Sequence, residues 1–334
     1  MFIPQAQSNI IKAISILLII LGHNHILAPQ DKNTLLFNFL YSFHVSIFFI
    51  LPFFYNKTTK LNKKNISTII TRNGIPYLLF FVFCYFIYHF ILIKNGLNLS
   101  EFFGGLINIP EYNLKSTTGF VFLWFLPVFL LMSLYKLIGS QYKWLMCIFF
   151  IIGFTFCINK QAYIFMWNAP FYLFKALYYY AMGLCTYFLF KYIKYMSYIG
   201  TAIFLILVVL FWTETYRANA FYFSITGFCA IKELTTQVDF SKCSLLKLIG
   251  KYSLSIYLIH VFIYNALERL LPQTFIWGII IYFITIGISL LISFCIYRIE
   301  ILRRFVFPKS WEEWISLFYK KKMHKRASII VIIN

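Results

Sequence analysis

Long apolar runs follow one another along almost the whole of this chain. They cover residues 8–28, 34–55, 73–93, 119–138, 142–158, 171–190, 196–213, 219–231, 249–267 and 274–297. A helix that crosses a bilayer needs about 20 such residues, and most of the runs are long enough. The run 219–231 is short, so we expect it to be tilted, interfacial or extended at its N-terminal end. The pattern predicts an all-α membrane protein, a bundle of about ten transmembrane helices.

The composition excludes an ordinary soluble domain. Of the 334 residues, 61% are hydrophobic and 12% are charged, whereas soluble domains carry about 25% charged residues. Lipid can solvate such an apolar exterior, and water cannot. We expect one transmembrane domain over residues 1–300. Residues 301–334 should form a basic cytoplasmic tail that is partly an amphipathic helix on membrane lipids, since Trp311, Trp314 and Phe318 precede a run of lysines.

The formal net charge of +20 has a topological explanation. With ten spans and a cytoplasmic N-terminus, the loops assigned to the inside hold most of the lysines and arginines, as the positive-inside rule requires. The C-terminus is then cytoplasmic too, and the protein is placed in the cell (inner or plasma) membrane. No nucleic-acid-binding motif accompanies the charge, so we expect no nucleic acid as a partner.

The seven cysteines show no metal-binding or redox spacing. We interpret them as small core residues without a disulfide framework. No metal is expected.

Ionisable residues inside apolar runs are the candidates for function, because burying them in lipid is costly. Lys12 and His23 are eleven residues apart, which places them on one helix face about 16 Å apart. His25 falls on roughly the opposite face. Lys12 could simply extend to the membrane surface, and His23 could be structural, but an imidazole inside a span needs a hydrogen-bond partner or a wet cavity.

Two further patterns involve polar residues at helical spacing. Arg72 follows a lysine cluster at the start of the third run, where its guanidinium is suited to phosphate; the alternative is a purely topological role. Ser253, Tyr257 and His260 lie at i, i+4 and i+7, forming one polar stripe. This stripe either bonds to a neighbouring helix or lines a cavity.

Six short motifs occur in order between residues 5 and 297. They are Lys12 to His23 ending in Leu21-Gly22-His23, Phe43-His44-Val45-Ser46-Ile47-Phe48-Phe49, Arg72 to Tyr77, Leu123-Trp124-Phe125-Leu126-Pro127, Tyr180-Ala181-Met182-Gly183, and Gly250 to His260. In these the chain resembles the acyltransferase-3 family of polytopic membrane enzymes, which O-acylate polysaccharides and other acceptors. The chain departs from the family pattern at Lys12, where arginine is usual, and near Arg72, where a second arginine is missing.

The resemblance implies an O-acetyltransferase type of enzyme in polysaccharide biosynthesis. Acetyl-CoA or another acyl-CoA would be the donor, with its phosphates near Lys12 and Arg72. His23 would be the general base on a hydroxyl of a cell-surface or lipid-linked saccharide, or would carry the acyl group covalently. A list of expected substrate-pocket residues follows from the same motifs: His44, Trp124, Ser253, Tyr257 and His260.

Two other functions fit a polytopic basic chain. One is a flippase or transporter of lipid-linked saccharides without acyl transfer, which would consume no acyl-CoA. The other is a non-catalytic family member that serves as a binding partner, which would tolerate loss of His23.

Overall fold

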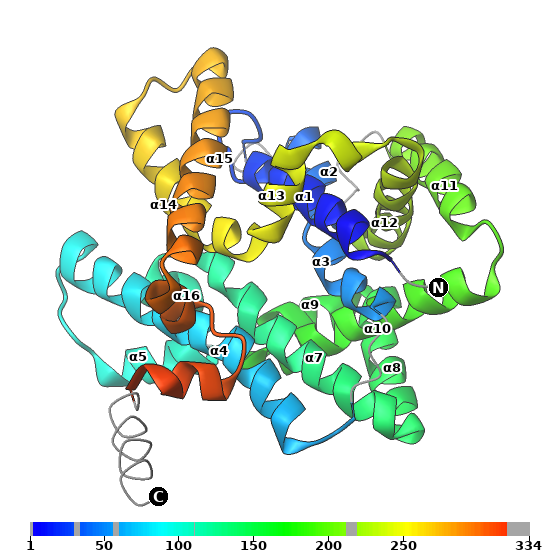
Figure 1. Cartoon of the computed structure of the whole chain (residues 1–334), viewed down its shortest axis with the longest axis horizontal. Coiled ribbons are helices and arrows are strands. Elements are labelled where there is room, and N and C mark those ends of the chain that lie inside the picture. Colours follow the sequence, from blue (N-terminus) through cyan, green and yellow to red (C-terminus); the bar gives the residue numbers. More distant parts are fainter. Residues whose placement is uncertain (1–2, 30–33, 56–59, 110, 212–218, 319–334) are drawn as a thin grey trace, which may run out of the picture. The chain divides into compact units, whose positions relative to one another are not determined.

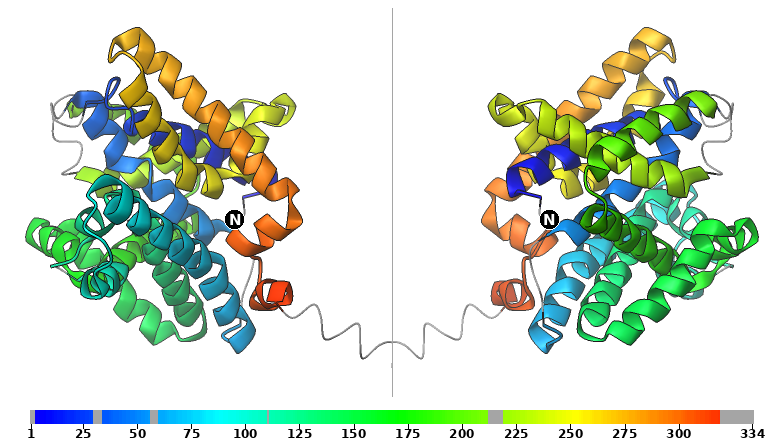
Figure 2. Two further views of the ribbon diagram at one scale, coloured as in Figure 1. Left: turned by 90° about the vertical axis from the view of Figure 1, so that its left-hand side faces the viewer. Right: turned by 90° about the vertical axis from the view of Figure 1, so that its right-hand side faces the viewer.

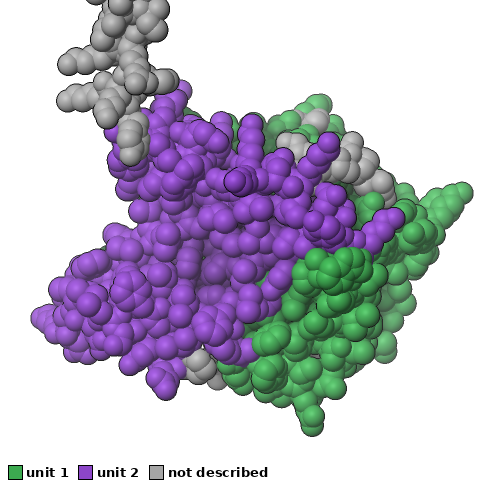
Figure 3. All heavy atoms as spheres, turned by 90° about the horizontal axis from the view of Figure 1, so that it is seen from below, with its two compact units in different colours: residues 1–58, 144–168, 174–294 green, residues 59–143, 169–173, 295–334 purple. Residues whose placement is uncertain are grey.

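The computed structural model describes residues 3–29, 34–55, 60–109, 111–211 and 219–318. Within these ranges the chain is helical and has no β-strand, only an isolated bridge between Ile109 and Tyr112. The all-α class is therefore confirmed. The chain divides into two compact units, which Figure 3 shows in green and purple. Unit 1 comprises residues 1–58, 144–168 and 174–294, and unit 2 comprises residues 59–143, 169–173 and 295–334.

Unit 1 contains the first helices of the chain and most of its C-terminal half (Figure 1). Its helices are α1 (Gln5–Gly22), α2 (Leu35–Phe43), α3 (Ser46–Ile50), the 3-10 helix η1 (Leu51–Phe54), α8 (Lys143–Ile158), α9 (Lys160–Asn168), α10 (Leu173–Tyr192), α11 (Met196–Leu210), α12 (Ala220–Gln237), the 3-10 helix η6 (Phe240–Lys242), α13 (Ser244–Lys251), α14 (Ser253–Leu270) and most of α15 (Phe275–Arg298). In Figure 2, α15 is a single long helix, drawn in orange.

Helix α1 is the centre of unit 1, because α2, α12, α13 and α14 all pack against it. Small residues allow this close packing. A Cβ atom on Gly250 of α13 would lie 1.8 Å from the backbone oxygen of Asn9 on α1. Tyr252 is non-helical and separates α13 from α14, so the chain bends by 85° there. The bend directs α14 along the C-terminal end of α1.

Unit 2 is built around the long helix α4. Its elements are α4 (Lys63–Phe86), the π-helix η2 (Ile87–Leu92), α5 (Leu99–Ile107), α6 (Leu114–Thr118), η3 (Val121–Trp124), α7 (Phe125–Gln141), η4 (Pro170–Tyr172) and α16 (Glu300–Val306). The Asn62 side chain caps the start of α4. Hydroxyls of α4 then bond the backbone of the following segment: Tyr77 donates to Leu106 and Tyr85 to Asn98.

Each of the ten predicted runs overlaps at least one described helix, although the helices differ in length from the runs. Among the described residues, five helical segments are long and apolar enough to cross a membrane: 5–22, 35–54, 63–92, 121–141 and 275–298. The pairs α8–α9 and α13–α14, bent by 107° and 85°, raise this number to seven if each pair is one span. The described helices thus support a multi-pass membrane protein, while the ten-span count and the cytoplasmic termini stay predictions.

The short run 219–231 forms the 18-residue helix α12, which continues past the run to Gln237. The extension is at its C-terminal end; the predicted N-terminal extension falls on residues 212–218, outside the described residues. In the tail, residues 311–318 are helical, and the lysine run that begins at residue 320 is outside the described residues.

Candidate functional site

His23 lies at the C-terminal cap of α1, immediately after the last helical residue. Its Nδ1 is 2.9 Å from the carbonyl oxygen of Ile19. A carbonyl only accepts, so Nδ1 carries the hydrogen and the neutral ring keeps a free lone pair on Nε2. The half-buried ring is therefore held in the tautomer that a general base acting through Nε2 requires.

His44 and His260 repeat this arrangement. His44 caps the C-terminal end of α2, in the break before α3, and its Nδ1 bonds to the carbonyl of Leu40. His260 lies within α14, with Nδ1 2.7 Å from the carbonyl of Tyr257 and 3.1 Å from that of Ile256. Both rings are buried, and neither Nε2 has a hydrogen-bond partner among the described residues. Buried polar atoms without a partner are uncommon and suggest a ligand or water that satisfies them.

The three imidazoles gather around the C-terminal end of α1. The rings of His23 and His260 meet edge to face, with 5.1 Å between their centroids. Tyr41 lies between His23 and His44, with ring centroids 6.1 and 4.8 Å from theirs. A Cβ atom on Gly22 would be 3.8 Å from Nε2 of His44, so Gly22 lies next to that nitrogen.

This cluster presents hydrogen-bond acceptors and has no metal-binding geometry. Across the described ranges, no group of three or more histidine, cysteine, aspartate or glutamate side chains is close enough to hold a metal ion. The free lone pairs can instead accept hydrogen bonds from hydroxyl groups, or remove a proton from one of them.

The rest of the predicted stripe on α14 is buried in the same unit. The ring of Tyr257 contacts that of His260, with centroids 5.9 Å apart. Ser253 is buried in the first turn of α14, about 10 Å along the axis from His260. Tyr257 thus belongs to the histidine cluster, and Ser253 lies away from it.

Lys12 lies three turns before His23 on α1. Its Nζ is 5.7 Å from the ring centroid of Tyr55, whose hydroxyl is 3.1 Å from the hydroxyl of Ser8. Lys12 lies within α1, and His23 follows the last residue of the same helix as its C-terminal cap. The prediction for His25 is wrong, because α1 ends at Gly22 and His25 lies in the turn that follows.

Arg72 and Trp124 belong to unit 2. Arg72 is exposed on α4, and it forms no hydrogen bond or ion pair with another described residue. Trp124 is the last residue of η3, and its ring contacts that of Phe125. Both residues thus belong to a different unit from His23, which is in unit 1.

Sequence reasoning missed Tyr41 and Asn24. Asn24 is fully buried directly after His23. Its amide nitrogen donates to the carbonyl of Gly278 at 2.8 Å, and its side-chain oxygen accepts from the backbone nitrogens of Ile26 and Leu27. It therefore fixes the turn that carries His23 and His25 against α15. The only sign of Asn24 in the sequence was an amide side chain within the apolar run 8–28.

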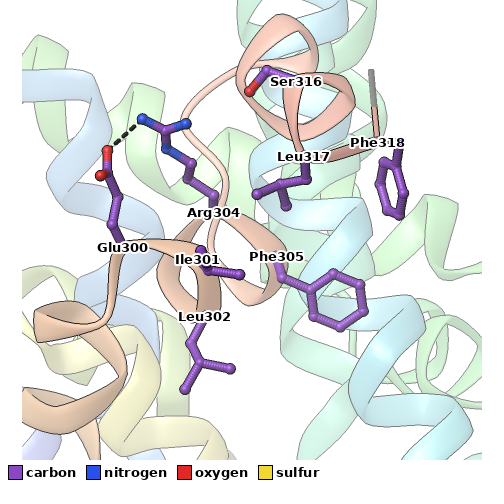
Figure 4. A pocket seen from close by; sticks show the side chains of 8 residues that line it. All are labelled: Glu300, Ile301, Leu302, Arg304, Phe305, Ser316, Leu317 and Phe318. Carbon is purple, nitrogen blue, oxygen red and sulfur yellow. Dashed lines mark hydrogen bonds and ion pairs between the residues drawn. The ribbon is translucent and has the colours of Figure 1, made fainter. Parts of the chain in front are cut away.

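A pocket of about 400 Å³ lies elsewhere, in unit 2 (Figure 4). It is lined by Glu300, Ile301, Leu302, Arg304, Phe305, Ser316, Leu317 and Phe318. None of the predicted site residues lines it, and it lies between α16 and the helical residues 311–318. We assign it no part in the chemistry.

Comparison with known proteins identifies the family. The model of the acyltransferase domain family, acyltransferase-3, matches residues 6–298, nearly the whole chain. Searches of curated proteins and of solved structures found no match. The family supports an acyltransferase activity in a multi-pass membrane protein, and so implies an acyl donor and an acceptor substrate. On this match, the resemblance seen in the sequence is confirmed, and the chain belongs to the acyltransferase-3 family.

Proposed function

We propose that this protein is a membrane O-acyltransferase that moves an acyl group, acetyl by default, from cytoplasmic acyl-CoA to a hydroxyl of a cell-surface or lipid-linked saccharide. One observation carries the proposal within the known family. Each of the three clustered imidazoles has Nδ1 committed to a backbone carbonyl and Nε2 without a partner among the described residues. A site made of acceptors suits a ligand rich in hydroxyl donors, and a saccharide is such a ligand.

In the proposed reaction, His23 Nε2 takes the proton from the acceptor hydroxyl as its oxygen attacks the thioester carbonyl. The carbon–sulfur bond then breaks, and the leaving CoA thiolate takes the proton from the His23 imidazolium. The products are the O-acyl saccharide and CoA, with no net change in protons. The alternative route, in which Nε2 first accepts the acyl group, uses the same free lone pair.

We assign His44 and His260 to binding the acceptor. Their neutral Nε2 atoms can each accept a hydrogen bond from a hydroxyl, and Tyr257 and Tyr41 pack beside them. In this assignment the two histidines orient the sugar, and orientation contributes to the rate by holding the hydroxyl near the thioester.

The donor side of the proposal uses cations. Lys12 lies on α1 about 16 Å from His23, a separation that an extended pantetheine arm would bridge. Arg72 is exposed, and its guanidinium is free among the described residues to bind a phosphate. Trp124 and Ser253 remain proposed pocket residues on the family motifs alone.

The test is acyl transfer by the purified protein and its His23→Ala variant. The substrates are acetyl-CoA and surface glycan from cells that lack the gene. The two products, CoA and the acylated glycan, are both measured. Loss of a general base should lower kcat by roughly 10²–10⁴-fold in a variant that keeps the native thermal unfolding profile.

The outcomes separate the alternatives. Full transfer by a folded His23→Ala protein would remove His23 from the mechanism. No CoA release by the native protein, together with transport of lipid-linked saccharide into vesicles, would favour the flippase function. A glycan that binds without reacting would favour the non-catalytic partner.

A further inference from the structure

A line of polar side chains continues from the histidine cluster toward the far end of α14. His260, Tyr264 and Glu268 are spaced four residues apart, so they share one face of the helix. Each meets the turn after α1: His260 contacts His23, while Tyr264 and Glu268 contact His25. His260, at one end of this line, is fully buried. Glu268, at the other end, contacts His25, whose side chain is 44% exposed.

Hydrogen bonds show which groups donate and which accept at the exposed end of the line, around Glu268 and His25. The Tyr264 hydroxyl accepts from the backbone N–H of His25 at 2.7 Å and donates to Glu268 Oε1 at 3.0 Å. Glu268 Oε2 is 3.5 Å from Nδ1 of His25. A carboxylate offers about four lone-pair positions, so Glu268 keeps acceptor capacity beyond these two contacts. With Nδ1 facing the carboxylate, His25 also presents Nε2.

This exposed end is held in place before any ligand binds. The three hydrogen bonds of Asn24 fix the turn against α15. A Cβ atom on Gly278 would lie 2.9 Å from a side-chain atom of Ile26, so the absence of a side chain there permits the close approach. A fixed set of acceptors binds with less loss of conformational entropy than a flexible one.

We propose that His25 and Glu268, supported by Tyr264, form an outer subsite that binds hydroxyls of a second sugar ring of the acceptor. The inference rests on the proposed function. Glu268 lies eight residues beyond His260, about 12 Å along the helix. A single monosaccharide does not span this distance when its reacting hydroxyl is at His23, whereas linked sugar rings do. The acceptor is therefore an oligosaccharide or polysaccharide segment.

The experiment compares acceptors of different length. Surface glycan from cells lacking the gene is cut with mild acid and separated into monosaccharide and oligosaccharide fractions. Acetyl-CoA-dependent CoA release is measured with each fraction for the native protein, for Glu268→Gln and for His25→Ala. Glu300→Gln is the matched control, because Glu300 is a carboxylate paired with Arg304 on α16, in the other unit.

We expect Glu268→Gln to raise KM for the oligosaccharides roughly tenfold, the loss of a charge-assisted hydrogen bond. The variant should keep the native kcat, the native KM for acetyl-CoA and the native weak activity on monosaccharides. His25→Ala should also raise the KM for the oligosaccharides. Glu300→Gln should behave as the native protein.

Two results for the Glu268→Gln variant would overturn the subsite. One is an equal rise in KM for both acceptor lengths, and the other is a fall in kcat accompanied by a lower unfolding temperature; each means that Glu268 only supports the turn. Equal use of both lengths by the native protein would also refute it, while leaving the acyltransferase function intact. Absence of transfer to any fraction would overturn the function and the subsite together.

Discussion

Replacing Gly250 with alanine should damage the protein through a single added methyl group. The Cβ would lie 1.8 Å from the backbone oxygen of Asn9, 2.5 Å from its carbonyl carbon and 3.0 Å from its Cα. All three atoms are backbone atoms of α1, so no side-chain rotation can relieve the overlap. Ordinary contact begins at 3.4 Å, and α13 must therefore move away from α1 by about 1.6 Å.

This displacement has an energetic and a functional consequence. Overpacking a close interface costs about 1–3 kcal/mol, and a backbone-to-backbone clash belongs at the upper end. For a chain of this size that corresponds to a fall of roughly 5 °C in the unfolding temperature. Because α14 begins three residues after Gly250, His260 should shift relative to His23. A misplacement of 1 Å can cost about 10²-fold in rate.

The assay pairs thermal unfolding in detergent with acetyl-CoA turnover. Gly287→Ala is the control, since a Cβ there meets nothing within 4 Å; it should be neutral or slightly stabilising, because alanine favours the helix over glycine. If Gly250→Ala unfolded at the native temperature and turned over at the native rate, the close contact between α13 and α1 would be wrong.

Two further predictions concern charged residues of unit 2. Arg72→Ala should raise the KM for acetyl-CoA with little change in kcat, because it removes a proposed phosphate contact; Arg298→Ala serves as the control, and an unchanged KM would leave Arg72 with a topological role alone. In the tail, the bond from Arg303 lowers the pKa of Glu313, so this pair stabilises α16 above the ordinary glutamate pKa, and the stabilisation is lost as the pH falls through the lowered value. The hydrogen-exchange protection factors of residues 300–318, which correct for the slower intrinsic exchange in acid, should fall as the pH drops through the lowered pKa of Glu313. They should already be low at neutral pH in Glu313→Gln; identical protection factors in the two proteins at neutral pH would contradict the pairing.

Several features of the site were predictable because they lie within one helix. Tyr257 and His260 share α14, and helical spacing correctly placed their rings side by side. Lys12 lies on α1, and His23 caps the C-terminal end of that helix. The same reasoning failed for His25. It assumed that the helix continued through the run 8–28, but α1 ends at Gly22, and after that point an angle per residue no longer applies.

The apolar sequence pattern also did not predict the helix breaks within two of the runs. The run 34–55 divides at His44 into α2 and α3, and the run 249–267 overlaps two helices that meet at an 85° bend. Residues on both sides of each break are apolar and helical, so composition and periodicity continue across it. The bend at Tyr252 depends on α13 packing against α1, a contact between distant parts of the chain.

The sequence by itself determined the helical class, the membrane environment and the family, because each depends on composition, local periodicity or short motifs in order. The tertiary structure decided which polar groups meet. His23, His44 and His260 come from three separate segments, and only the packing of α2 and α14 around α1 brings their rings together. The same packing pairs His25 with Glu268. Local pattern shows that a polar residue in an apolar run needs a partner, but the partner is chosen by long-range contacts that no local pattern contains.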